Sequence, residues 1–216
     1  QGIKIARDVV EDLGWKRSII SFEENSQEPL FSNEEILGLI PNDFKNSYDV
    51  RELILRLVDG SNFREFKPDY GVSTVCSIGY FYGCNCAIIG NNGPIDPDGA
   101  TKVAQFIQLC DQVNRPIIFL NNTTGFLVGK KYEHEGMIKH GSKMIQAVTN
   151  ARVSKITFYI GASYGAGNYG MCGYAFKPDF LFTWPNAKTG VMGGKQAAMT
   201  MNHVWTRASK RRGEKV

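Results

Sequence analysis

The 216-residue sequence has no cysteine arrangement typical of a disulfide-rich or zinc-stabilised domain. Its cysteines are odd in number and scattered, and no two of them form a Cys-x-x-Cys pair. Disulfide frameworks and zinc ribbons depend on such pairing, so the sequence argues against both. We therefore expect free thiols and a reducing compartment. The cysteines are Cys76, Cys84, Cys86, Cys110 and Cys172.

Long apolar runs, metal-ligand clusters and strong charge of one sign are also missing. The sequence has no apolar stretch long enough to cross a bilayer, so we expect no membrane partner. His134 and His140 are six residues apart and fall on different faces of a helix, so we expect no metal site. The net charge is only +4. The basic cluster near the C-terminus lacks interleaved aromatics, so we interpret it as a solvated tail and expect no nucleic-acid partner.

Hydrophobic residues make up 43% of the chain, which is sufficient for a packed core. Residues 2–13 have apolar positions at helical spacing, whereas the stretch that follows is irregular apart from a short helical turn at 34–39. No signal peptide is recognisable, and the chain begins at Gln1 rather than Met, which indicates a boundary where a targeting segment could have been lost. We predict a linker with an N-terminal helix at 1–46, one domain at 47–202 and a basic tail at 203–216.

The sequence predicts an α/β fold for the main domain. Its first helix, 50–58, has Ser47 or Asp49 as candidate caps, and a hairpin of strands 72–82 and 86–90 follows. From residue 98 onward helices alternate with short, continuously apolar strands, which favours a parallel sheet covered by helices. Ligands of such folds bind at the carboxyl ends of the strands. The predicted helices are 98–114, 132–150, a short one from 164 to 173, and one beginning at 194; the predicted strands are 117–120, 156–160, 180–184 and one near 191.

Two glycine-rich turns, 121–129 and 161–170, are predicted at those strand ends. The second matches two motifs of side-chain or nucleotide chemistry. Residues 165–170 fit G-x-G-x-x-G, a nucleotide-binding pattern, but the following helix is short and no acidic residue ends the next strand. Residues 161–165 fit G-x-S-x-G, the turn of a serine hydrolase, for which Asp179 and His203 would complete a triad with Ser163.

The same turn also fits an oxyanion hole made only of backbone amides. Such a hole needs a strand end, a helix start and small residues, but no side-chain nucleophile. The other turn, Thr124-Gly125-Phe126, ends the preceding strand and would present its backbone to the same crevice. That arrangement suits the stabilisation of an enolate.

Several longer motifs resemble the carboxyltransferase subunit of biotin-dependent acyl-CoA carboxylases. Ordered segments carry the resemblance from about residue 30 to residue 200, and the variants NTTGF and GNYGM are most similar to the methylcrotonyl-CoA and geranyl-CoA branch. The segments are YDVR (48–51), VDGS (58–61), IGNNG (89–93), NNTTGF (121–126), KHGSK (139–143), SYGAGNYGM (163–171), WPNA (184–187) and VMGGKQAA (191–198).

The resemblance implies a crotonase-like (ClpP/crotonase) ββα spiral domain, of which this chain holds the C-terminal, biotin-facing copy. It implies that carboxybiotin, carried on a biotin carboxylase or biotin carrier partner, gives its carboxyl group to an acyl-CoA of the 3-methylcrotonyl type. The amides of Ala166 and Gly167 would stabilise the ureido oxyanion of biotin. The residues implied to line the biotin site are Thr124, Gly125, Phe126, Tyr164 and Gly165.

The resemblance further implies a homo-oligomer, with a dimer as the minimal active-site unit and a hexamer at full length. The compartment would be the cytoplasm in a bacterium and the mitochondrial matrix in a eukaryote. The fragment is expected to lack turnover alone, because half of the site would lie on an absent domain. Lys195 and Ala162 depart from the acidic residue and the glycine usual in the family. A serine hydrolase, a non-catalytic assembly domain and a biotin-dependent acyl-CoA decarboxylase subunit stay open as alternatives.

Overall fold

A computed structural model of the chain describes residues 2–12, 26–41 and 48–213. Within this part, seven strands form one sheet in the order β1-β2-β3-β4-β5-β6, with β7 added along β5. The first three strands are antiparallel, whereas β3, β4, β5 and β6 run parallel. The strands are β1 Phe63–Glu65, β2 Thr74–Phe81, β3 Cys84–Asn91, β4 Ile117–Thr123, β5 Lys155–Tyr164, β6 Phe180–Thr183 and β7 Lys188–Gly190.

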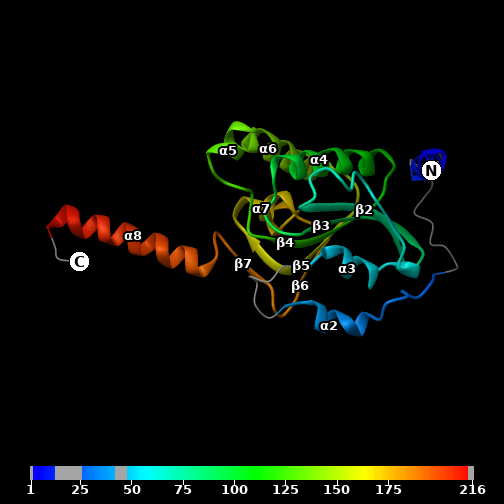
Figure 1. Ribbon diagram of the computed structural model, residues 1–216, viewed down its shortest axis with the longest axis horizontal. Coiled ribbons are helices and arrows are strands. Elements are labelled where there is room, and N and C mark those ends of the chain that lie inside the picture. The colour runs from blue at the N-terminus through cyan, green and yellow to red at the C-terminus, as the bar shows by residue number, and fades with distance from the viewer. Residues whose placement is uncertain (1, 13–25, 42–47, 214–216) are drawn as a thin grey trace.

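Helices cover both faces of this sheet, so the structure has the predicted α/β architecture (Figure 1). The face under α4 and α6 holds one buried cluster, which includes Ile89, Phe106 and Phe119. The face against α3 holds another, which includes Leu53 and Ile88. The helices are α1 Gly2–Asp12, α2 Ile36–Leu39, α3 Val50–Leu55, α4 Pro97–Gln112, α5 Lys130–His134, α6 Met137–Asn150, α7 Gly165–Gly170 and α8 Gly194–Arg212, and short 3₁₀ turns lie at Asn33–Glu35, Asp59–Ser61 and Tyr174–Phe176.

Local capping explains where the helices of the main domain begin. The Asp49 side chain accepts a hydrogen bond from the Arg51 amide at 3.0 Å and caps α3. Ser47, the other candidate, lies outside the described residues. Asp96 caps α4, which begins at Pro97, one residue earlier than predicted, because proline at the first helical position needs no amide partner.

The β2–β3 hairpin turns earlier than predicted. We expected the turn at 83–85, but Tyr82 and Gly83 form it with positive φ angles of 47° and 76°, and Cys84 already pairs with Phe81. Both turn amides donate to the Asp59 carboxylate, at 2.9 and 2.7 Å. The hydrogen bonds to this carboxylate, which is distant in sequence, offset the cost of placing a non-glycine residue, Tyr82, in the left-handed region.

The prediction that strand 156–160 ends before the glycine turn is wrong. Strand β5 continues through Gly161, Ala162 and Ser163 to Tyr164. The extension is paired, because β7 aligns with Ala162–Tyr164 in parallel register. The turn is therefore confined to the junction of Tyr164 with Gly165, where Gly165 has a φ of +56°.

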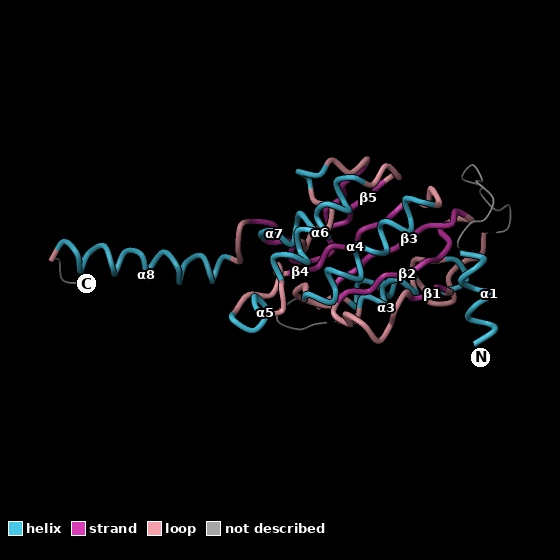
Figure 2. The backbone as a smooth tube through the Cα atoms, turned by 90° about the horizontal axis from the view of Figure 1, so that it is seen from above, coloured by secondary structure: helices cyan, strands magenta, loops and turns pink. Residues whose placement is uncertain are grey.

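Two further helical predictions change in the structure. The single helix expected at 132–150 is broken into α5 and α6 at Gly136, which takes the left-handed conformation with a φ of 85°. The final helix begins at Gly194 as predicted, but it continues through residues 203–212, which we had assigned to a tail. Both views show α8 projecting from the body, and none of its described residues is buried (Figures 1 and 2). Among the described helices, none combines the length and apolarity that a bilayer span requires.

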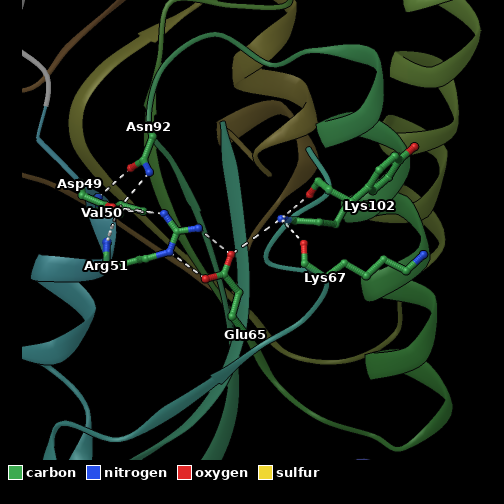
Figure 3. A network of polar contacts seen from close by, with 8 residues as sticks. Asp49, Val50, Arg51, Glu65, Lys67, Asn92 and Lys102 are labelled. Atoms are coloured by element: carbon green, nitrogen blue, oxygen red, sulfur yellow. Dashed lines mark hydrogen bonds and ion pairs between the residues drawn. The ribbon is translucent and has the colours of Figure 1, made fainter. Parts of the chain in front are cut away.

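A partly buried ion-pair network joins α3, β1 and α4 (Figure 3). Arg51 of α3 donates from Nε and Nη2 to the two carboxylate oxygens of Glu65, at 2.7 Å each. The Glu65 Oε1 atom also lies 3.8 Å from Nζ of Lys102, whose side chain is fully buried. Lys102 Nζ donates to the carbonyl oxygens of Lys67 and Tyr70 at 3.2 and 2.8 Å. Glu65 therefore links the helical layers on the two faces of the sheet.

The buried Cys110 thiol makes a pH-dependent contribution to stability. Burial raises its pKa from the ordinary value of 9.0 to about 12. The unfolded chain releases this proton near pH 9 while the native protein keeps it, so the stabilisation is complete below pH 9 and is lost as pH rises toward 12. We expect Cys110→Ala to reduce the alkaline decline in unfolding free energy by about 1.4 kcal/mol per pH unit above pH 9. Urea unfolding at pH 8, 9.5 and 10.5 measures this, and parallel curves for the two proteins would contradict it.

Candidate active site

The candidate site lies where the parallel strands β4 and β5 end. Thr123 of β4 is aligned with Ser163 of β5, after a register irregularity that follows Asn121. Beyond Thr123 the chain enters the Gly125 turn, which we define as Thr124, Gly125 and Phe126. Gly125 has a φ of +122°, and its carbonyl oxygen accepts a hydrogen bond from the Ile95 amide at 2.9 Å. The turn is thus fixed to the loop before α4.

The first turn of α7 packs directly on the Gly125 turn. A Cβ atom added to Gly167 would lie 2.7 Å from Cα of Gly125, which is closer than real Cβ contacts permit. A Cβ added to Gly170 would lie 3.0 Å from the Phe126 ring. These glycines therefore allow backbone to approach backbone, and they place the start of α7 beside the end of β4.

Two amides at this helix start have no acceptor within α7; Ala166 is exposed, whereas Gly167 is buried. Because α7 begins at Gly165, the amides of Ala166 and Gly167 precede the first intrahelical donor. Within the described part of the chain, no side chain caps α7, and its first turn carries no acidic residue. The partial positive charge of these N–H groups is left unneutralised, which favours a negatively charged oxygen.

An open, largely apolar groove of about 400 Å³ borders this helix start. Ala166, which is exposed, lines the groove together with Phe126, and Glu133 contributes a carboxylate. The rest of the lining comes from the segment after the Gly125 turn and from α6, namely Leu127, Val128, Met137, Ile138, Gly141, Ser142 and Ile145. The arrangement can hold an apolar group while the Ala166 backbone meets a polar one.

The structure separates the residues that we predicted to bind the cofactor. Phe126 lines the groove with Ala166, whereas Thr124 lines a different cavity of about 80 Å³. The Gly125 amide is already engaged, since it donates to Thr123 Oγ1 at 3.2 Å, so Gly125 contributes close packing instead. Tyr164 lies beside the segment that joins β7 to α8, where a Cβ added to Gly193 would lie 3.6 Å from its ring.

Sequence reasoning missed the α6 side of the groove. Met137 and Gly141 lie on the buried face of α6, so their spacing in the sequence indicates core residues and not a groove lining. Ile138 lies one residue away from that face and is 80% exposed. An isoleucine on the polar face of an amphipathic helix, beside Ser142 four residues later, was the available signal.

The serine hydrolase reading is not compatible with the structure. Ser163 is fully buried in β5, and its Oγ accepts a hydrogen bond from Asn168 Nδ2 at 2.6 Å. Asp179 instead accepts from the Lys155 amide, at the opposite end of β5. Ser163 lies eight positions after Lys155 along the strand, a distance of about 26 Å. His203 lies on the projecting α8, so no triad assembles from these three described residues.

We expect a fluorophosphonate probe to leave Ser163 unlabelled, because its hydroxyl is buried and neither proposed triad partner reaches it. Intact-mass measurement of the folded chain after incubation with the probe checks this. Ser163→Ala should give the same mass spectrum as the unsubstituted chain apart from the substitution. A probe adduct that disappears in the variant would restore the hydrolase reading.

The nucleotide reading is also weakened. Helix α7 has six residues, and β6 ends at Thr183 and is followed by Trp184 and a proline. No acidic residue in this described segment stands where the ribose of a dinucleotide would need one. Among the described residues, His, Cys, Asp and Glu form no group of three or more that could hold a metal ion.

Comparison with known proteins extends over the whole chain. Residues 1–216 match the carboxyl transferase domain family. The chain is 47% identical over 204 residues to the mitochondrial methylcrotonoyl-CoA carboxylase β chain of Dictyostelium discoideum, covering 94% of this chain and 35% of that one. It is 47% identical over 215 residues to a probable biotin-dependent acyl-coenzyme A carboxylase β2 subunit of Mycobacterium tuberculosis, covering 99% and 40%.

Solved structures show the same fold. The β subunit of geranyl-CoA carboxylase from P. aeruginosa superposes with a TM-score of 0.82 at 52% identity, covering 95% of this chain and 40% of that one. Transcarboxylase 12S superposes with a TM-score of 0.82 at 31% identity, covering 90% and 39%. The crotonase-like fold is confirmed, and the chain spans about two fifths of the length of these relatives. By sequence and by structure, this chain belongs to the carboxyl transferase domain family.

Proposed function

We propose that this chain is the biotin-facing part of an acyl-CoA carboxyltransferase of the methylcrotonoyl-CoA type. The observation that carries the proposal is the uncapped start of α7 beside an apolar groove, at the carboxyl ends of two parallel strands. The relatives that support it are named methylcrotonoyl-CoA carboxylase β chains and geranyl-CoA carboxylase β subunit. Family membership supports carboxyl transfer as the reaction class. The backbone amides at the start of α7 are the groups through which this chain would take part in that reaction.

The residues present suit a ureido ring and its oxygen. When bound, carboxybiotin would supply the carboxyl group that is transferred to the acyl-CoA. The amides of Ala166 and Gly167 would donate hydrogen bonds to the ureido oxygen as negative charge develops there. Phe126 and the apolar lining of the groove would bury the ring and exclude water, which strengthens those hydrogen bonds.

The amides act only if they stay in place while charge develops. The packing of Gly167 against Gly125 and of Gly170 against Phe126 provides this rigidity. Preorganised donors do not reorient during the reaction, so their stabilisation lowers the barrier rather than the ground state. We therefore assign Gly125 a positioning role and Ala166 and Gly167 the catalytic role.

The proposal extends to partners and compartment. We propose that the complete protein works with a biotin carboxylase or biotin carrier subunit and assembles as a homo-oligomer, with a dimer as its smallest active unit. The transcarboxylase 12S relative is described as a hexamer assembly, which supports a hexamer here. Eukaryotic relatives are mitochondrial, so we propose the matrix for a eukaryotic source and the cytoplasm for a bacterial one.

A turnover assay tests the proposed function. The complete protein, combined with its biotin-bearing partner, is assayed with methylcrotonyl-, geranyl- and propionyl-CoA, and we expect carboxylation with preference for a branched, unsaturated chain. Residues 1–216 alone should show none, because the acyl-CoA half of the site is missing. Absence of carboxylation in the complete system would support an assembly domain, and release of carbon dioxide from a carboxylated acyl-CoA would support a decarboxylase.

A further inference from the structure

Two cysteine thiols lie in contact at the start of β3, on the hairpin far in sequence from the candidate active site. Cys84 and Cys86 alternate with Asn85 along the strand, so their side chains share one face. The two Sγ atoms are 3.7 Å apart. Cys86 is 6% exposed, whereas Cys84 is half-buried and is the more accessible of the two residues. The Asp59 carboxylate fixes the adjacent turn, so the pair is held in place.

The distance between the sulfurs favours a shared ligand over a disulfide. A disulfide requires an S–S distance of about 2.05 Å and Cα atoms no more than about 6.8 Å apart. Residues two apart in a strand have Cα atoms about 6.6 Å apart, near that limit, and the sulfurs would have to move together by more than about 1.5 Å. Two sulfurs bonded at about 2.3 Å to one pyramidal atom, with an angle of about 100° between the bonds, lie about 3.5 Å apart. The observed spacing of 3.7 Å is much closer to this second geometry than to a disulfide, so the sulfurs need to move only slightly.

The surroundings favour a ligand that needs two sulfurs and no more. No further His, Cys, Asp or Glu joins the pair to make a group of three among the described residues. Burial raises the pKa of the Cys86 thiol well above its ordinary value. A simple metal cation must expel that proton from a buried thiol, which costs affinity. A reagent that removes both thiol protons as water avoids this cost.

We propose that Cys84 and Cys86 form a binding site for monosubstituted trivalent arsenicals. In the reaction of an organoarsenic(III) oxide, the arsenic–oxygen bond breaks and two arsenic–sulfur bonds form. The oxygen leaves as water with the two thiol protons, and no atom changes its oxidation state. Cys84 reacts first because it is the more accessible thiol, and Cys86 closes the chelate. This site is separate from the proposed carboxyltransferase function.

Intact-mass spectrometry of the folded chain with phenylarsine oxide tests the proposal. We expect one adduct per chain that survives a monothiol wash and is removed by a dithiol. Cys84→Ser and Cys86→Ser should each abolish the wash-resistant adduct, whereas Cys110→Ser, the matched control in the opposite core cluster, should retain it.

Circular dichroism confirms that each variant is folded, and Cys86→Ala replaces Cys86→Ser if the buried hydroxyl prevents folding. A wash-resistant adduct that persists in the Cys84 variant would overturn the proposal. So would the lack of any adduct on the folded, unsubstituted chain.

Discussion

Replacing Gly167 by alanine in the complete protein is expected to reduce the kcat of carboxyl transfer about 100-fold. The new Cβ would lie 2.7 Å from Cα of Gly125 and 3.1 Å from the Thr123 methyl group, so backbone must move. The contacts are with the end of β4 and with the Gly125 turn, so relief of the clash would displace the first turn of α7. Displacing preorganised donors by about 1 Å costs on the order of 10²-fold in rate. Steady-state kinetics with the biotin-bearing partner measures the change.

A second glycine provides the matched control for this substitution. Gly38 in α2 is exposed, and a Cβ added there meets nothing within 4 Å. Gly38→Ala should therefore leave kcat unchanged. Circular dichroism and thermal unfolding of both variants separate loss of the site from loss of the fold. A Gly167→Ala protein that is folded and fully active would show that the position of this helix start does not matter for the rate.

Replacing Glu65 by glutamine is expected to lower the unfolding free energy by about 3 kcal/mol. Glutamine keeps the shape of the side chain but removes the negative charge beside the fully buried Lys102 and one of the two carboxylates that pair with Arg51. Removing one partner of a buried ion pair costs about 3–5 kcal/mol, because the remaining charges stay desolvated. Urea-induced unfolding of the chain, followed by circular dichroism, measures the loss.

The Arg56–Glu35 pair supplies the comparison. Its atoms approach to 2.8 Å, but the Glu35 carboxylate is half exposed, and Arg56 keeps a second ion pair with Glu52 at 2.9 Å. Exposed ion pairs contribute little to stability, so Glu35→Gln should leave the midpoint of unfolding close to that of the unsubstituted chain. Equal midpoint shifts for the two variants would mean that the Glu65 network contributes no more to the free energy of unfolding than the Arg56–Glu35 pair.

The layout of the sheet could be predicted because its signals are local. Apolar runs such as Ile117–Leu120 indicated buried parallel strands, and Asp49 indicated the start of α3. The turn at Tyr82 and Gly83 was misplaced because a non-glycine residue there depends on Asp59, more than twenty residues away. Hydrogen bonds to a distant carboxylate leave no trace in local sequence patterns.

The candidate site could be predicted only in part, for the same reason. The small residues at Gly165 and Gly167 indicated a tight strand-to-helix junction, and the structure has one. The extension of β5 through Ser163 depends on pairing with β7. This contact lies between segments distant in the sequence, and the pattern of hydrophobic residues does not predict it. The burial of Ser163 follows from that extension, so the sequence alone left the hydrolase reading open.

In the proposed mechanism, the amide hydrogens of Ala166 and Gly167 stabilise an oxyanion. The most direct test replaces each amide by an ester in the complete protein, using an α-hydroxy acid at position 166 or 167, so that one N–H is lost and no side chain changes. We predict that kcat falls about 10²–10³-fold at either position with little change in the KM for acyl-CoA. The same ester at Gly194, another helix start, should have no effect. Unchanged turnover with the esters at positions 166 and 167 would contradict the assignment.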